Sequence, residues 1–287
     1  MSVNRDGEIR GEIESDWNWP FARSLVDLFH FASPADVFTR DWYHMTTAYM
    51  FSRLLYAELT EQLAGAVKLL PDDARFMFHR GAYAEVQSLP INQVLLRGVD
   101  LYAIRLLRQG RRLPAQTSAA TRAAAALDLP FKHEALEEAE RHFRLALKAD
   151  PRLIEARVRL GRVLIEGERY EEALGELRLA LDTGPTGDVA FYAHLFSGRA
   201  ARALERLDDA GRHFDEALRL FPAAQSALLA RSQLALLRAD VTAAVAPLQR
   251  LPKDPAPEDM KNDPWASYRL GIGREWEALY ASLIERK

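Results

Sequence analysis

The chain has 287 residues, of which 48% are hydrophobic and 28% charged, a balance typical of folded globular proteins and not of disordered chains. Its 38 Lys and Arg against 41 Asp and Glu give a formal charge of -3, so no overall positive excess favours nucleic acid or a membrane surface as a partner. The absence of cysteine excludes disulfide frameworks, thiolate metal sites and cysteine nucleophiles.

Residues 1–37 are expected to form an N-terminal arm or cap. They open on a stretch of mixed charge that lacks the apolar core of a signal peptide, and no apolar run in the chain reaches the roughly 18 residues of a membrane span. The aromatic residues of segments 16–21 and 41–43 are of the kind that closes the end of a helical stack. We expect a cytoplasmic protein, although a mature exported chain would look the same.

Divergent helix pairs are predicted for residues 38–86. Residues 42–70 are expected to form one pair, and a further helix that contains Gly81 follows Pro71. Residues 87–130 do not continue the pattern. There we expect an irregular insertion with one helix over about residues 91–108, followed by a loop rich in small and polar residues.

A repeat of about 34 residues dominates the chain from residue 131 onward. Small residues stand at positions 8 and 20 of each unit, a large apolar residue at position 24 and a proline at position 32. These places hold Gly161, Ala173, Leu177 and Pro185 in the unit that begins at Ile154, Gly198, Ala210, Phe214 and Pro222 in the unit that begins at Phe191, and Ala139, Phe143 and Pro151 in the preceding second helix. The small residues let two antiparallel helices approach closely, the large one fills the space beside them, and the proline ends the second helix.

The repeat predicts an array over residues 131–258, closed by a capping helix pair at residues 259–287. Turns between paired helices are expected near Gly167, Leu204 and Gly271. The last unit of the array is degenerate, and Pro247 inside its second helix predicts a kink. Asp263 is expected to cap a helix whose first residue is a proline.

The repeated positions resemble the tetratricopeptide repeat family over roughly residues 131–287, and the tail Asp263–Tyr268 resembles the end of some bacterial members of unassigned role. The resemblance implies an all-α fold in which antiparallel helix pairs stack into a right-handed superhelical solenoid. It also implies a non-enzymatic scaffold that binds a peptide or protein segment in a concave groove, lined by positions 2, 5, 9 and 12 of each first helix.

Carried over to this chain, the resemblance implies a groove of eight residues: Val158, Arg162, Tyr192, Leu195, Arg199, Arg202, Leu229 and Gln233. Arg162 and Arg199 share position 9, and two stacked guanidinium groups with Tyr192 between them suit the bidentate capture of carboxylates on an acidic peptide. Alternatively, both arginines simply pair with neighbouring glutamates. The Lys and Asn of the chaperone-type carboxylate clamp are missing, so chaperone docking of that kind is not expected.

No motif for catalysis was found. Phosphate-binding glycine loops, the nucleophile elbow and the His-Glu-x-x-His zinc motif are all absent, and the pair His133 and Glu137 lacks a third ligand for a metal. We therefore expect no enzymatic activity, no cofactor and no metal. Two alternatives stay open: a sensor or regulatory module that binds a small ligand or signalling peptide, and an enzyme with a site in the irregular N-terminal half.

Overall fold

The computed structural model describes residues 2–3, 9–10, 47, 63, 65–66, 68, 70–89, 111, 131–251 and 262–268. The chain divides into two compact units, residues 1–43 and 44–287. In the first unit, strand β1 (Ser2–Val3) pairs antiparallel with β2 (Ile9–Arg10). This short hairpin was not predicted, and the remainder of the expected N-terminal arm lies outside the described residues.

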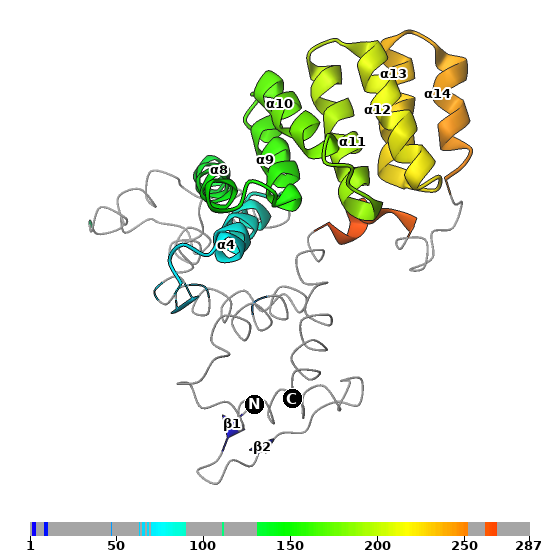
Figure 1. The fold of residues 1–287 in the computed structure, drawn as a ribbon. Coiled ribbons are helices and arrows are strands. Elements are labelled where there is room, and N and C mark those ends of the chain that lie inside the picture. The colour runs from blue at the N-terminus through cyan, green and yellow to red at the C-terminus, as the bar shows by residue number, and fades with distance from the viewer. Residues whose placement is uncertain are drawn as a thin grey trace. The chain divides into compact units, whose positions relative to one another are not determined.

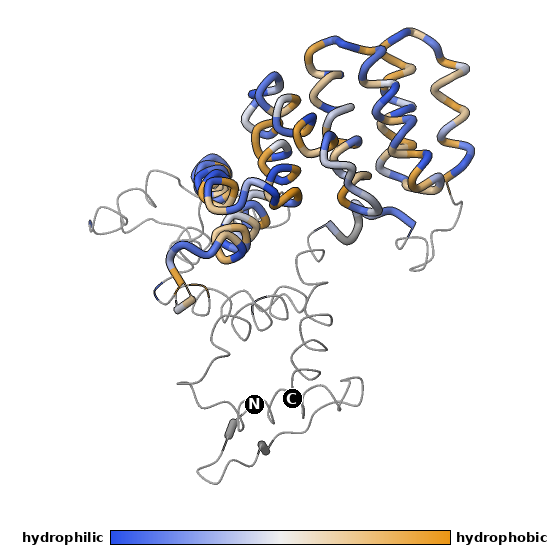
Figure 2. Tube along the Cα trace, viewed as in Figure 1, coloured by the Kyte–Doolittle hydropathy of each residue, from blue (hydrophilic) through white to orange (hydrophobic). Residues whose placement is uncertain are grey.

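Every described element of the second unit is helical, which confirms the all-α prediction (Figure 1). In chain order the elements are α4 (Ala74–Gln87), α8 (Lys132–Ala149), α9 (Ile154–Glu166), α10 (Tyr170–Leu181), α11 (Gly187–Ala203), α12 (Leu207–Leu220), α13 (Gln225–Leu237), α14 (Val241–Leu248) and the 3-10 helix η3 (Pro264–Ser267). Apolar and polar residues are interspersed along the repeat helices (Figure 2).

Helices α9 with α10, α11 with α12 and α13 with α14 form the predicted pairs. The first helix of the first two pairs ends directly before Gly167 and Leu204, as expected. The third expected turn, near Gly271, lies outside the described residues. In each of the three observed turns a non-glycine residue takes a left-handed backbone conformation; these are Glu168, Glu205 and Ala239, with φ of 60°, 60° and 58°.

A glycine at position 8 lets the two helices of a pair touch. A Cβ atom on Gly161 would lie 2.6 Å from Cγ of Leu177, and one on Gly198 would lie 2.4 Å from Cε1 of Phe214. The residue that needs this space is the large apolar residue at position 24, and it is fully buried in both units. The repeat positions therefore have the packing role that the sequence predicts.

The same contact identifies an additional helix pair. A Cβ atom on Gly81 of α4 would lie 2.7 Å from Cδ1 of Phe143 on α8, and the two helices pack along their lengths. Helix α4 is thus the first helix of the unit whose second helix is α8, although residues 88–131 separate them in sequence. This pairing places a first helix before residue 131, where the array was expected to begin. The helix predicted for residues 91–108 lies outside the described residues.

Of the expected capping pair, the structure describes residues 262–268. Helix η3 packs against α11, and its cap Asp263 accepts a hydrogen bond from the backbone N–H of Trp265, as predicted for the Asp-Pro pair. On the last unit, Leu236, Leu237 and Val241 remain 56–66% exposed. Helix α14 has only 8 residues and contains Pro247 at its penultimate position, where the missing N–H removes one hydrogen bond of the helix. Residues 269–287 of the predicted cap lie outside the described residues.

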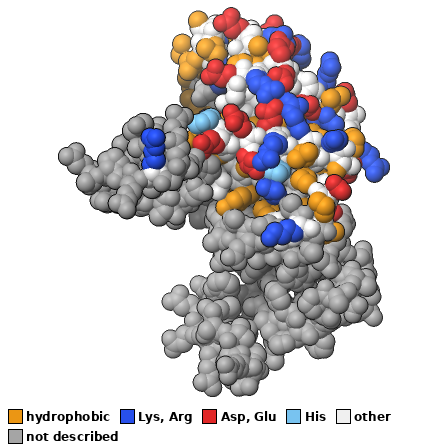
Figure 3. All heavy atoms as spheres, turned by 90° about the vertical axis from the view of Figure 1, so that its left-hand side faces the viewer, with side chains coloured by type: hydrophobic (Ala, Val, Ile, Leu, Met, Phe, Trp, Pro, Cys, Tyr) orange, Lys and Arg blue, Asp and Glu red, His pale blue; other side chains and the backbone are white. Residues whose placement is uncertain are grey.

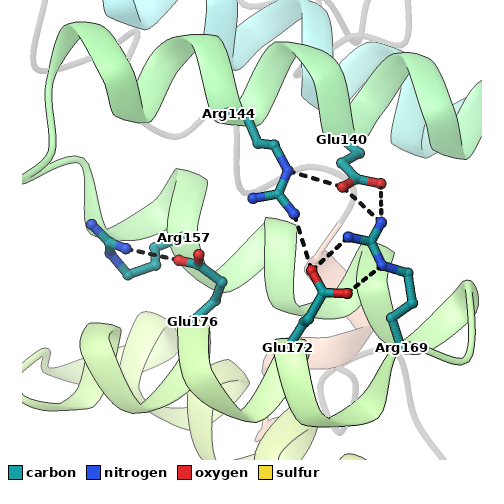
Figure 4. A network of polar contacts seen from close by, with 6 residues as sticks. All are labelled: Glu140, Arg144, Arg157, Arg169, Glu172 and Glu176. Atoms are coloured by element: carbon teal, nitrogen blue, oxygen red, sulfur yellow. Dashed lines mark hydrogen bonds and ion pairs between the residues drawn. The ribbon is translucent and has the colours of Figure 1, made fainter.

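Ion pairs join neighbouring second helices on the outer side of the array (Figure 4). Arg169 donates to Glu140 of α8 at 2.7 Å and to Glu172 of α10 at 2.6 Å, and Arg144 bridges the same two carboxylates. On the face in Figure 3, acidic and basic side chains are interspersed. Exposed pairs of this kind contribute little stability individually.

Candidate functional site

The first helices α4, α9, α11 and α13 follow one another along the array and form one surface, here called the first-helix wall. Residues 262–268 lie on this wall, beside α11 in Figure 1. The chain has folded its own C-terminal segment onto the surface where the family resemblance places a bound peptide.

A buried ion cluster lies at the centre of the wall. Glu85 of α4 accepts hydrogen bonds from Arg159 at 2.6 Å and from Arg162 at 2.8 Å, both on α9. Tyr268 donates its hydroxyl to Glu85 at 2.7 Å, and Arg159 donates to the backbone carbonyl of Tyr268 at 2.9 Å. All four residues are buried. Burial raises the pKa of the Tyr268 hydroxyl well above its usual value, so it stays protonated and remains a donor.

Aromatic rings of the segment lie over the arginines. The Cζ atom of Arg159 is 4.1 Å from the ring centroid of Tyr268, and that of Arg199 is 5.0 Å from the ring centroid of Trp265. The Tyr268 ring also meets the ring of Tyr192 edge-on, with centroids 4.9 Å apart. Cation–π contacts at these distances are attractive and grow stronger where water is excluded.

Polar contacts hold the start of the segment. Asp263 accepts hydrogen bonds from the backbone N–H of Ser226 at 2.7 Å and from its hydroxyl at 2.9 Å. The hydroxyl of Tyr192 donates to the backbone carbonyl of Pro264 at 2.6 Å. Every first helix of the array therefore contributes at least one hydrogen bond to the segment.

Beside the segment a pocket of about 530 Å³ remains open between α11 and α13. Its lining residues are Arg199, Arg202, Gln225, Ser226, Leu229, Ala230, Gln233, Asp263 and Trp265. Burial and the like charges of Arg162 and Arg202 lower the pKa of Arg199 to about 10. Arg202 donates to the side-chain oxygen of Gln233 at 2.6 Å. The pocket thus presents two cations and the carboxylate of Asp263, which Ser226 already holds, beside apolar side chains.

The eight residues predicted from the repeat positions separate into two groups. Arg199, Arg202, Leu229 and Gln233 line the open pocket together. Val158, Leu195, Tyr192 and Arg162 are buried. Val158 and Leu195 belong to the apolar core, Tyr192 lies beneath the segment, and Arg162 is held by Glu85, which is the glutamate pairing that the sequence left open as an alternative.

Sequence reasoning missed Glu85, Arg159 and the docked segment, whereas Ser226 falls at position 2 of the unit that begins at Gln225, a groove position of the family. One signal was available for Glu85: when the unit is counted from Ala74, with Gly81 at position 8, Glu85 falls at position 12, also a groove position. Glu85 was missed because the groove positions were applied only to the units from Ile154 onward.

The described residues offer binding groups and no catalytic constellation. No cluster of three or more metal-ligating side chains occurs among them. None of their helices combines the length and the apolar character needed to cross a bilayer. A second pocket, of about 660 Å³, is lined by α10, α11 and α12 and contains His194 and His213, whose Nδ1 atoms are 3.2 Å apart.

Comparison with known proteins gives an independent test of the fold. Two models of the tetratricopeptide repeat match residues 131–195 and 197–259. Among solved structures, PilF from Pseudomonas aeruginosa is 16% identical with a TM-score of 0.52 over 86% of this chain and 90% of its own. PilW, described as a widely conserved type IV pilus biogenesis factor, is 16% identical with a TM-score of 0.51 over 86% of this chain and 94% of its own.

At this identity the likeness to PilF and PilW shows the fold alone. No curated protein matches the chain in sequence. The repeat spacing, the glycine contacts between paired helices and the two family matches agree. Residues 131–195 and 197–259 therefore carry tetratricopeptide repeats, stacked helix pairs of the kind that serves as a protein-interaction scaffold.

Proposed function

We propose that the protein is a non-enzymatic scaffold that binds an acidic segment of a protein partner in the pocket between α11 and α13. The observation that carries this proposal is the pair Arg199 and Arg202, which line the same pocket. In the part of the chain that the structure describes, neither arginine forms an ion pair with a carboxylate, whereas Arg159, Arg162 and most other arginines do.

A carboxylate in this pocket would remove an electrostatic cost. Arg199 is largely buried beside two other guanidinium groups, which is why its pKa falls to about 10. A bound anion would offset both the desolvation and the like-charge repulsion, and the planar guanidinium fork binds carboxylates in two-point geometry. The pocket therefore favours an anionic ligand.

The apolar part of the pocket favours a peptide over a bare anion. Leu229 is 45% exposed beside Ala230 and the Trp265 ring, and the volume of about 530 Å³ lies in the range of ordinary ligand sites. A segment with one carboxylate and a neighbouring apolar side chain would use both parts. We infer a protein partner and not a nucleic acid, because the chain carries a net charge of -3. We also propose that the scaffold is cytoplasmic.

Charge reversal tests this proposal. Fluorescent hexapeptides that contain Asp or Glu, and matched peptides with Asn or Gln instead, are titrated against the wild type, Arg199→Glu, Arg202→Glu and the control Arg178→Glu. We expect selective binding of acidic peptides that weakens about 10-fold or more in the first two variants, because a buried attraction becomes a repulsion. Binding should also weaken with salt.

Arg178 of α10 is a suitable control because it lines the other pocket, so its reversal should leave affinity within about twofold. An equal loss in Arg178→Glu, or equal binding of the neutral peptides, would refute the proposed site. Arg162→Glu is not a useful variant here, because a second carboxylate beside buried Glu85 would test stability and not binding.

A further inference from the structure

The docked segment reaches the wall from far away in sequence. Tyr268 contacts Glu85 from 183 residues away, and Asp263 contacts Ser226 from 37 residues away. Within the described residues 262–268, helix η3 has four residues and packs against α11. Its position on the wall must come from the specific contacts that it makes there.

Those contacts are of the kind that recognises a peptide. The wall donates hydrogen bonds to two backbone carbonyls of the segment, from Tyr192 to Pro264 and from Arg159 to Tyr268. Ser226 of the wall donates to the acidic side chain of the segment, Asp263. The two aromatic rings of the segment pack against arginines and aromatic residues of the wall. The pattern recognised is an acidic residue followed by aromatic residues two and five positions later.

The surface beneath the segment combines charged groups with apolar core residues, since Tyr268 and Trp265 also pack against the rings of Tyr192 and Phe196. Two guanidinium groups face the single carboxylate of Glu85, and the Nε atom of Arg162 is buried without a hydrogen-bond partner. The rings of Trp265 and Tyr268 lie over these charges at 4.1–5.6 Å. Docking therefore gains ring burial and cation–π attraction but removes charged groups from water, and the two effects oppose each other.

A surface whose charged groups regain hydration when it is uncovered favours a ligand that binds reversibly. Uncovering a purely apolar core would expose only carbon, whereas uncovering this surface exposes the Phe196 ring together with two arginines and a glutamate that water can solvate. We propose that residues 263–268 are a built-in, displaceable ligand of the first-helix wall, and that the wall is a receptor for partner segments with the same acidic and aromatic pattern.

This site adjoins the pocket of the proposed function, because Ser226, Asp263 and Trp265 belong to both. The receptor groups Glu85, Arg159 and Tyr192 lie outside the pocket that contains Arg199 and Arg202. The experiment uses the chain's own sequence as its probe and alters the segment, whereas the pocket is tested with unrelated acidic peptides and with Arg199 and Arg202, so the failure of one proposal can be told from the failure of the other.

The probe is a fluorescent peptide of residues 261–270, Lys-Asn-Asp-Pro-Trp-Ala-Ser-Tyr-Arg-Leu, titrated by anisotropy against the full chain. The variant Trp265→Ala/Tyr268→Ala frees the wall by weakening its own segment. If the segment covers the wall in 90–99% of wild-type molecules, this variant should bind the peptide about 10- to 100-fold more tightly. The matched control Asn262→Ala, at an exposed residue of the same segment, should bind like the wild type.

A peptide with alanine in place of both aromatic residues should bind none of the proteins. Equal affinity of the wild type and the double variant for the intact peptide, or binding to neither, would overturn the proposal. Asp263→Ala removes the contacts to Ser226 while both rings remain, and it should give an intermediate gain. This milder variant keeps the test decisive if the double variant does not fold.

Displacement can also be observed in the unaltered chain. The protein is labelled with 5-fluorotryptophan, and the Trp265 signal is assigned in the fluorine NMR spectrum with Trp265→Phe. Saturating unlabelled peptide should move this signal toward the position of a solvent-exposed tryptophan, while the alanine peptide leaves it unchanged. A Trp265 signal that does not respond to the intact peptide would contradict displacement.

Discussion

Gly198 shows how one missing side chain determines a helix crossing. The ring of Phe214 fills the place of its Cβ atom, with Cε1 only 2.4 Å from where that atom would be. Phe214 is fully buried, so its ring has no free space into which to retreat. Position 8 of the repeat is therefore small for a steric reason.

Gly198→Ala should lower the free energy of unfolding by about 1–3 kcal/mol, because the added methyl group overpacks the crossing. The matched control is Gly175→Ala on α10, where nothing lies within 4 Å of the added atom. This control should raise stability by about 0.5–1 kcal/mol, because glycine is a poor helix former. Urea unfolding measures the change in the free energy of unfolding for each variant. If the two changes have the same sign, the steric explanation of position 8 is wrong.

The turns inside the helix pairs also repeat a feature, since each places a non-glycine residue in the left-handed region. Glu205→Gly should raise the free energy of unfolding by up to about 1 kcal/mol, because glycine adopts this conformation without steric cost. Glu205→Ala retains the strain and should change stability by less than about 0.5 kcal/mol. Thermal unfolding of both variants tests whether the left-handed backbone conformation of Glu205 is strained. Equal stabilisation by alanine and by glycine would show that it is not.

At the scale of elements, α11 and α12 bring two histidines together. Burial lowers the pKa of His194, and burial together with the nearby His194 lowers the pKa of His213. The carboxylates of Asp209 and Glu216 only partly oppose these effects. Both imidazoles therefore take up protons less readily in the folded chain than in the unfolded chain.

Stability should fall as the pH drops from about 7.5 to 5.5, because the unfolded histidines, with a pKa of about 6.5, bind protons that the folded ones do not. Thermal unfolding across this range should show a steeper loss for the wild type than for His213→Gln, whose side chain is neutral at every pH. Parallel losses in the two proteins would show that other groups control this pH dependence.

At the scale of the whole molecule, the array extends across a long interruption. Helices α4 and α8 pack as a pair although residues 88–131 separate them, and Gly81 makes the same contact as the glycines of the uninterrupted units. Because helices in a solenoid depend on their immediate neighbours, the stability of α8 should depend on α4.

Gly81→Ala should therefore accelerate hydrogen exchange in α8, since its Cβ atom would lie 2.7 Å from Phe143. Helix α12, two units away, provides the internal control and should keep its protection. Unchanged exchange in α8 would mean that α4 and α8 do not form a cooperative pair.

The sequence alone determined the helical class, the period of the array, the buried glycine and alanine positions, and the Asp-Pro helix start at residue 263. These features are local or periodic: each depends on residues a few positions apart, or on the same spacing repeated from unit to unit. The stacked pair expected at repeat position 9, Arg162 with Arg199, is divided in the structure, because Arg162 is held by Glu85 while Arg199 lines the pocket with Arg202.

Only the tertiary structure decided that α4 belongs to the array, that Arg162 pairs with Glu85, and that residues 263–268 lie on the first-helix wall. The partners in these contacts are separated by tens to hundreds of residues, across segments that do not follow the period. Repeat position indicates which way an arginine points, but its exposure depends on what the rest of the chain places over it. For Arg162 that cover is Glu85 and two aromatic rings, while Arg199 still faces an open pocket.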